Sequence, residues 1–78
     1  MTDTDLVELL AEAVHDQWMA TKHAQGVTSR RSETGEELMR PYNHLSEPQR
    51  DLDRNSVLAV LTAAGHLGYH LTRADHGR

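Results

Sequence analysis

The chain lacks cysteine and phenylalanine, and both absences limit what it can be. Without cysteine it has no disulfide framework, no thiolate zinc site and no cysteine nucleophile. Without phenylalanine, its large aromatic side chains are limited to Trp18, Tyr42 and Tyr69, so the core must consist mainly of Leu, Val, Ala and Met. Aliphatic cores of this kind suit helices packed against helices.

The chain also lacks an excess of positive charge and any long apolar run. Its formal net charge is −4 with neutral histidines, which disfavours binding to a nucleic acid polymer, because such binding depends on neutralising phosphates. No apolar run approaches the roughly 20 residues that cross a bilayer. Residues 1–5 are too acidic and polar for a secretory signal. We therefore expect a cytoplasmic protein without membrane contact.

The first predicted helix follows the acidic start of the chain. Asp or Thr at positions 3–4 can cap it, and apolar residues recur at helical spacing over residues 6–18. Gly26 is a natural residue for the C-terminal cap, so we expect this helix to end near Ala24.

The second predicted helix has the clearest start in the sequence. Ser46 is followed three residues later by Gln49, which forms a capping box. The cap-forming residues 53–56 leave two possibilities open, one long helix or two helices that meet there. Gly65 and Gly68 are expected to end the helical run.

The segment between the helices has the composition of a loop. Residues 28–37 are almost all polar, and long ordered loops often carry function. We predict an all-α fold in which two main helices pack antiparallel, with room for a third, and a long ordered loop connects them. The chain is expected to form one domain over residues 1–78, with its core at about 5–71 and a loose tail at 72–78.

Several short patterns follow one another in a defined order: His15-x-x-Trp18-x-x-x-Lys22-x-x-x-Gly26, Arg30-Arg31, Pro41-Tyr42-x-x-Leu45, Asp53-Arg54 and Gly68-Tyr69. With this order and spacing, the chain resembles the ryanodine-receptor repeat (RyR) domain over roughly residues 12–71. Two positions depart from the family pattern. Val27 stands where the family usually has an aromatic residue, and Glu36-Glu37 stand where it tends to have His-Pro.

The resemblance implies a small helical module. Such modules are repeated in large calcium-release channels, and they also occur alone or fused to other domains in bacterial and viral proteins. The family is not known as an enzyme fold, and nucleotide-type ligands have been associated with it. The resemblance therefore implies a binding protein rather than an enzyme.

Physical reasoning on the same residues indicates a ligand site. A tryptophan offers a flat surface for stacking a base, arginine and lysine suit phosphate, and a carboxylate can accept from a hydroxyl or amino group. We predict a module that binds a small anionic, nucleotide-type ligand without a cofactor, as a sensor or a sequestering protein. The candidate ligand-binding residues are His15, Trp18, Lys22, Arg30, Arg31, Tyr42, Asp53 and Arg54.

These residues also have structural explanations. Trp18 can belong chiefly to the core, the turn at Tyr42 can be structural, and Asp53-Arg54 can be a helix cap or a salt-bridge pair. The alternative function is a protein–protein interaction module, docking a partner or a second copy through an aromatic patch around Trp18 and Tyr42.

Catalysis and metal binding have little support in the sequence. No P-loop, nucleophile elbow or dinucleotide fingerprint is present. His66 and His70 have the spacing of helical zinc ligands, but Gly68 between them argues against a continuing helix. We expect no metal site and no enzymatic activity.

Overall fold

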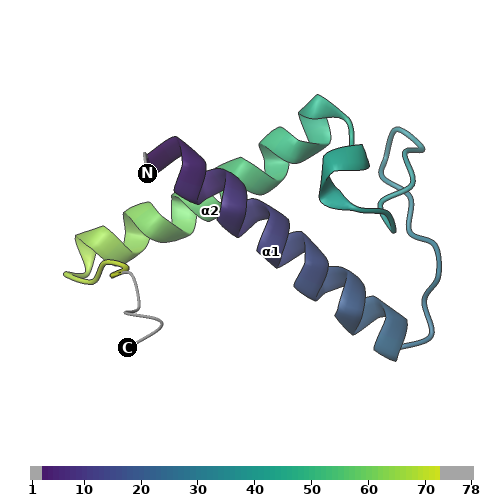
Figure 1. Cartoon of the computed structure of the whole chain (residues 1–78), viewed down its shortest axis with the longest axis horizontal. Coiled ribbons are helices and arrows are strands. Elements are labelled where there is room, and N and C mark those ends of the chain that lie inside the picture. Colours follow the sequence, from purple (N-terminus) through teal and green to yellow (C-terminus); the bar gives the residue numbers. More distant parts are fainter. Residues whose placement is uncertain (1–2, 73–78) are drawn as a thin grey trace, which may run out of the picture.

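Two helices that cross like the arms of an X dominate the computed structural model (Figure 1). The structure describes residues 3–72, with side chains from Leu6 onward. Helix α1 spans Asp3–Ala24 and helix α2 spans Glu47–His66, and the two cross at a wide angle. A short 3-10 helix, η1, covers Tyr42–His44. The described residues form no strand, which confirms the predicted all-α fold with two main helices and a long connecting loop.

Both main helices end in the same glycine-dependent motif. In α1, Val27 N–H donates to the Lys22 carbonyl over 2.9 Å and Gly26 N–H donates to the His23 carbonyl over 3.0 Å. Gly26 has a φ of +81°, a left-handed conformation that glycine adopts without a steric penalty. These two bonds form a Schellman motif, which satisfies carbonyls at the helix end.

Helix α2 repeats this ending around Gly68. The φ of Gly68 is +91° and Tyr69 N–H donates to the Ala64 carbonyl over 2.8 Å. The prediction that Gly65 also ends the helix was wrong, since Gly65 lies inside its last turn. Glycine at that position keeps a helical conformation because a single glycine weakens a helix without forcing it to stop.

The start of α2 shows half of the predicted capping box, because Ser46 caps the helix but its backbone N–H donates to Glu36 and not to the Gln49 side chain. The Ser46 hydroxyl accepts from Gln49 N–H over 3.3 Å. The cap-forming residues 53–56 do not break the helix, so α2 is one continuous element. Within this run, the Ser56 hydroxyl donates back to the Leu52 carbonyl over 3.1 Å, a bond that a helix interior accommodates.

The loop between α1 and η1 folds back on itself. An isolated antiparallel bridge pairs Arg31 with Glu37, and Gly35 N–H closes the tip by donating to the Ser32 carbonyl over 2.9 Å. Glu36 then ties the loop to α2, since its carboxylate accepts from both the backbone N–H and the hydroxyl of Ser46, each over 2.7 Å. Hydrogen bonds therefore hold the loop at its tip and against the start of α2.

The core lies where the helices cross. It is small, and its buried apolar residues come from α1, η1 with the residue after it, and α2: Val7, Ala11, Tyr42, Leu45 and Val57. Leu10, Leu38 and Leu61 pack against this cluster. Since the helices diverge away from the crossing, apolar residues farther along them stay exposed.

Two further observations concern the chain as a whole. Within the described residues, no helix combines the length and the apolar character needed to cross a membrane. The predicted loose tail at 72–78 falls, apart from Thr72, outside the residues that the structure describes.

Candidate functional site

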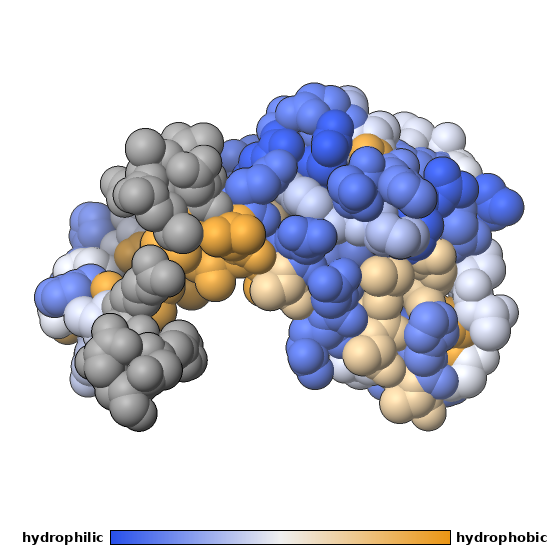
Figure 2. Space-filling model, in the orientation of Figure 1, coloured by the Kyte–Doolittle hydropathy of each residue, from blue (hydrophilic) through white to orange (hydrophobic). Residues whose placement is uncertain are grey.

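An open groove of about 700 Å³ runs between the two helices and the connecting loop. Figure 2 shows that this face of the molecule is hollowed below the helix crossing, with apolar surface gathered at the hollow. The apolar residues lining the groove are Leu10, Val14, Trp18, Leu38, Val57, Val60, Leu61 and Leu71. The polar residues lining it are His15, Arg30, Gln49, Asp53 and Ser56.

The α1 wall carries two stacked rings. The His15 and Trp18 ring centroids lie 5.6 Å apart with an angle of 26° between the planes. His15 Nε2 lies 2.8 Å from the Arg40 carbonyl oxygen. Because a carbonyl only accepts, Nε2 carries the proton and donates it, which fixes the orientation of the imidazole. The fixed imidazole in turn supports one face of the indole, which stays partly exposed to the groove.

The loop contributes one arginine to the groove and turns its neighbour away. The Glu37 carboxylate accepts from Arg30 N–H over 2.8 Å, and Leu38 N–H donates to the Arg30 carbonyl over 2.7 Å. The backbone of Arg30 is thus clamped on both sides while its side chain lines the groove. Arg31 instead donates from Nη1 to the Gly35 carbonyl over 2.9 Å, within the loop tip.

Glu37 is the anchor of this loop. It accepts from the Ser29 hydroxyl and from the backbone N–H groups of Arg30 and Met39. These hydrogen bonds, that from Ser29 above all, lower the pKa of Glu37 from 4.5 to about 2. The carboxylate is therefore charged throughout the neutral range and holds the loop in one conformation.

Two residues of the α2 wall, Asp53 and Ser56, present hydrogen-bond acceptors. Among the described residues, Asp53 Oδ2 is buried and has no hydrogen-bond partner. Burial raises the pKa of Asp53 above its ordinary value of 3.8, and the charge of nearby His15 opposes this rise. The Ser56 hydroxyl hydrogen is already donated to the Leu52 carbonyl, so the oxygen of Ser56 offers the groove only its lone pairs.

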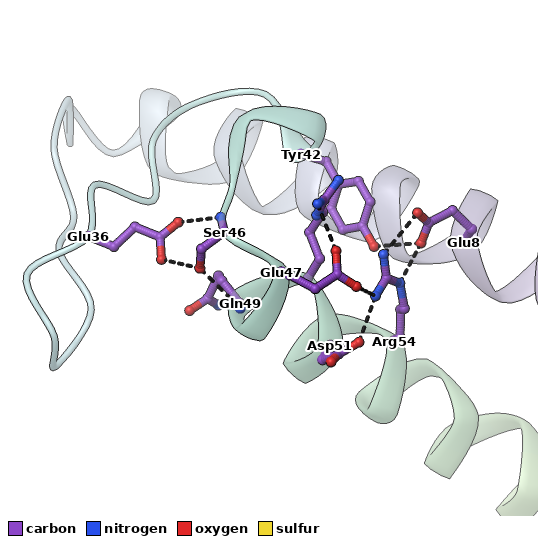
Figure 3. Close-up of polar contacts among 9 residues, drawn as sticks. Glu8, Glu36, Tyr42, Ser46, Glu47, Gln49, Asp51 and Arg54 are labelled. Atoms are coloured by element: carbon purple, nitrogen blue, oxygen red, sulfur yellow. Dashed lines mark hydrogen bonds and ion pairs between the residues drawn. The ribbon is translucent and has the colours of Figure 1, made fainter.

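A closed ionic network lies outside the groove (Figure 3). Arg54 donates from Nε to Glu8 Oε1 over 2.7 Å and from Nη1 to Glu47 over 2.7 Å and to Asp51 over 2.6 Å. The Tyr42 hydroxyl donates to the same Glu8 oxygen over 2.7 Å. This network links α1, η1 and α2, so its role in the structure is to tie the three elements together.

The charges of this network shift the pKa values of its members in the directions that pairing demands. Hydrogen bonds from Arg54 and then Tyr42 lower the pKa of Glu8 from 4.5 to about 2. Burial and the Glu8 carboxylate raise the pKa of Tyr42 to about 12. The carboxylates of Glu8, Glu47 and Asp51 hold the pKa of Arg54 above its ordinary value. Every charged member is matched by an opposite charge or a donor.

The eight candidate site residues therefore fall into two groups. His15, Trp18, Arg30 and Asp53 come together around the groove. The other four lie elsewhere. Lys22 lies near the C-terminal end of α1, where its Nζ is 3.5 Å from the side-chain oxygen of Gln25. Arg31 is bound within the loop tip, and Tyr42 is 3% exposed in the core. Arg54 belongs to the ionic network.

Most of the apolar lining was not identified from the sequence as part of a site. On α2 the lining residues Gln49, Asp53, Ser56 and Val60 follow helical spacing, and on α1 Leu10, Val14 and Trp18 do the same. The available signal was an apolar stripe on α1 and a stripe on α2 that mixes polar residues with a valine. Such stripes are easily taken for ordinary core faces, since the same spacing serves both.

Among the described residues, no group of three or more His, Asp or Glu side chains is placed to hold a metal ion. His66 and His70, which have the spacing of helical zinc ligands, lie at and beyond the end of α2, because the helix stops at His66.

The fold and the groove define a small all-α domain with an open groove between two crossing helices. The family model described as the RyR domain matches residues 2–73, which is nearly the whole chain. The chain therefore belongs to the RyR domain family, as its sequence patterns predicted. Searches of curated proteins and of solved structures found no match.

Proposed function

We propose that this RyR domain is a cytoplasmic, non-enzymatic module that binds an anionic, nucleotide-type ligand in the groove, as a sensor or a sequestering protein. One observation carries the proposal: the stacked rings of His15 and Trp18 and the Arg30 side chain line the same groove. An indole face stacks well with a base, and a guanidinium pairs well with phosphate oxygens. A chain without cysteine suits the reducing cytoplasm.

The size and lining of the groove agree with this proposal. Small-molecule sites have volumes of roughly 300–1,000 Å³ and are mostly apolar, with a few placed polar groups. At about 700 Å³ and with the polar groups described above, the groove has room for a nucleoside phosphate. The clamped backbone of Arg30 lowers the entropy lost when its side chain meets an anion.

The second candidate function is a protein-interaction module that docks a partner or a second copy through Trp18. The exposed groove residues Val14 and Val60, 58% and 68% exposed, favour it, because exposed apolar surface often marks a contact site. Tyr42 is buried and adds no surface to such a patch. A concave groove with an arginine in its lining supports the small ligand better than a flat partner surface.

A thermal-shift screen tests the proposal. The panel contains purine and pyrimidine nucleoside monophosphates, cyclic nucleotides and ADP-ribose. A ligand at a hundred times its dissociation constant adds roughly 2.7 kcal/mol to the stability, so a true ligand raises the melting temperature of this small domain by several degrees. No shift with any compound contradicts the proposal and favours the protein-interaction function.

Two neighbouring arginines provide a matched pair of variants for the same screen. Arg30→Ala and Arg31→Ala remove the same charge from the same loop, but only Arg30 lines the groove. We expect Arg30→Ala to weaken binding about tenfold or more, as loss of a charge-assisted hydrogen bond does. Arg31→Ala should retain most of the affinity. Equal losses in both variants would mean that only the overall charge matters and that the site is misplaced.

A further inference from the structure

We infer that the groove selects a guanine-type base, a planar ring with two adjacent N–H donors, and that Asp53 accepts from both. This inference rests on the proposed function, since it specifies which nucleotide the groove takes.

Asp53 is a groove carboxylate for which the described residues provide no hydrogen-bond donor to its buried oxygen. The nearest arginine in sequence, Arg54, is directed to Glu8, Glu47 and Asp51, and Arg50 pairs with Glu47. A buried acceptor without a donor costs free energy. A ligand that supplies donors to this carboxylate gains that free energy on binding.

The α2 wall around Asp53 strengthens the requirement for donors on the ligand. Ser56, one turn after Asp53, has already donated its hydroxyl hydrogen to the Leu52 carbonyl. An ionised carboxylate only accepts. Asp53 and Ser56 therefore present acceptors to the groove, and a base edge that faces these two residues, rather than the amide of Gln49, needs N–H groups.

Two walls of the groove carry opposite charges, Arg30 on the loop and Asp53 on α2, and this difference orients a charged ligand. Arg30 on the loop suits a phosphate, whereas a phosphate beside Asp53 would be repelled. The base end of a nucleotide therefore faces Asp53, with the indole of Trp18 as its stacking surface. The carboxylate can adjust to a base, because the torsion that turns its two oxygens is broad.

Guanine and adenine differ at the edge that matters. Guanine has N1–H beside its 2-amino group, two parallel donors that match the two oxygens of a carboxylate. Adenine has the 6-amino donor beside N1, an acceptor that would face a carboxylate lone pair. A bidentate pair of this kind discriminates between bases by about tenfold or more.

The experiment titrates GMP, IMP, AMP and XMP into the full chain and measures each affinity by calorimetry. We expect GMP to bind tightest, IMP about tenfold more weakly because it lacks the 2-amino donor, and AMP more weakly still. Asp53→Asn should reverse the preference toward XMP, since a carboxamide accepts from N1–H and donates to the 2-oxo group of xanthine. A general loss of structure cannot produce such a reversal.

Asp51→Asn is the matched control, because Asp51 lies on the same helix and pairs with Arg54 outside the groove. It removes the same charge and should keep the ratio of GMP to AMP affinity. Equal affinities for the four nucleotides, or an unchanged ratio in Asp53→Asn, would overturn the guanine inference and leave the proposed function standing. Failure of all four nucleotides to bind would overturn the guanine inference, and the absence of a shift with every compound of the wider thermal-shift panel would overturn the proposed function as well.

Discussion

Asp53 and Arg54 are neighbours on α2, yet they differ in their hydrogen-bond partners. Arg54 is bound by three carboxylates in a network that also includes the Tyr42 hydroxyl, whereas the buried oxygen of Asp53 has no partner among the described residues. The two residues divide the molecule into a closed side, formed by the Tyr42–Leu45 core and the Arg54 network, and an open side, formed by the groove.

The difference between the sides indicates a division of labour. On the closed side, apolar groups are buried and the charges of the Arg54 network are paired, as stability requires. On the open side, apolar residues stay exposed and one buried oxygen of Asp53 is left without a hydrogen-bond donor, which costs stability. Proteins retain such locally unfavourable features chiefly where binding uses them. Substitutions on each side of the molecule can test this division.

The largest effect is expected from the core of the closed side. Leu45→Ala removes a buried side chain and should lower the free energy of unfolding by about 3 kcal/mol. Leu58→Ala is the control, because Leu58 is an exposed leucine of α2 and should cost less than about 1 kcal/mol. Urea unfolding measures both. Equal costs would show that the small core does not lie at Tyr42 and Leu45.

A smaller effect is expected from separating the two neighbours. Arg54→Met leaves Glu8, Glu47 and Asp51 without their common partner, and the exposure of these carboxylates to solvent keeps the loss of stability well below that of Leu45→Ala. Asp53→Asn should leave stability unchanged or raise it, because it removes an unpaired charge. If both substitutions destabilised the domain equally, the division into a closed and an open side would be wrong.

The smallest effect is a pH dependence with opposite signs on the two sides. Glu8 has a folded pKa of about 2 against an ordinary value of 4.5, so its contribution is present above pH 4.5 and is lost as the pH falls toward 2. Glu8→Gln should reduce the loss of unfolding free energy at acid pH by less than about 1 kcal/mol, because solvent screens the charge of Glu8. Glu37 titrates in the same window, so some slope remains.

Asp53 should act in the reverse direction, because its folded pKa is raised. The folded state then binds more protons than the unfolded state, so the contribution of Asp53 to stability falls as the pH rises above 3.8. Unfolding curves of Asp53→Asn and Glu8→Gln between pH 2 and 6 should therefore depart from the parent curve in opposite senses. Departures of the same sign would contradict the assigned surroundings of one of the two carboxyl groups.

Much of the fold could be predicted because its signals are local. The capping serine at position 46, the glycine at 26 and the helical spacing of apolar residues each act within one or two turns. The continuity of α2 through residues 53–56 could not be predicted, because cap-forming residues inside a helix are tolerated once tertiary contacts hold it. Gly65 inside the last turn has the same explanation.

The site could be predicted only in part. The sequence placed Arg30 and Arg31 together and Asp53 and Arg54 together, but it could not say which member of each pair enters the groove. That choice depends on long-range contacts, since Glu37 clamps the backbone of Arg30 and Glu8 on α1 captures Arg54. No pattern within a single element carries this information.

The most direct test of the central claim, that the groove is a nucleotide-binding site, uses the only tryptophan of the chain. Trp18 lines the groove, so its fluorescence reports on that place alone. Titration with GMP and AMP should quench the emission saturably in the parent chain and in Arg31→Ala. In Arg30→Ala, the same quenching should need about tenfold higher nucleotide concentrations. Unchanged Trp18 emission at saturating nucleotide, or identical curves for the two arginine variants, would contradict the account.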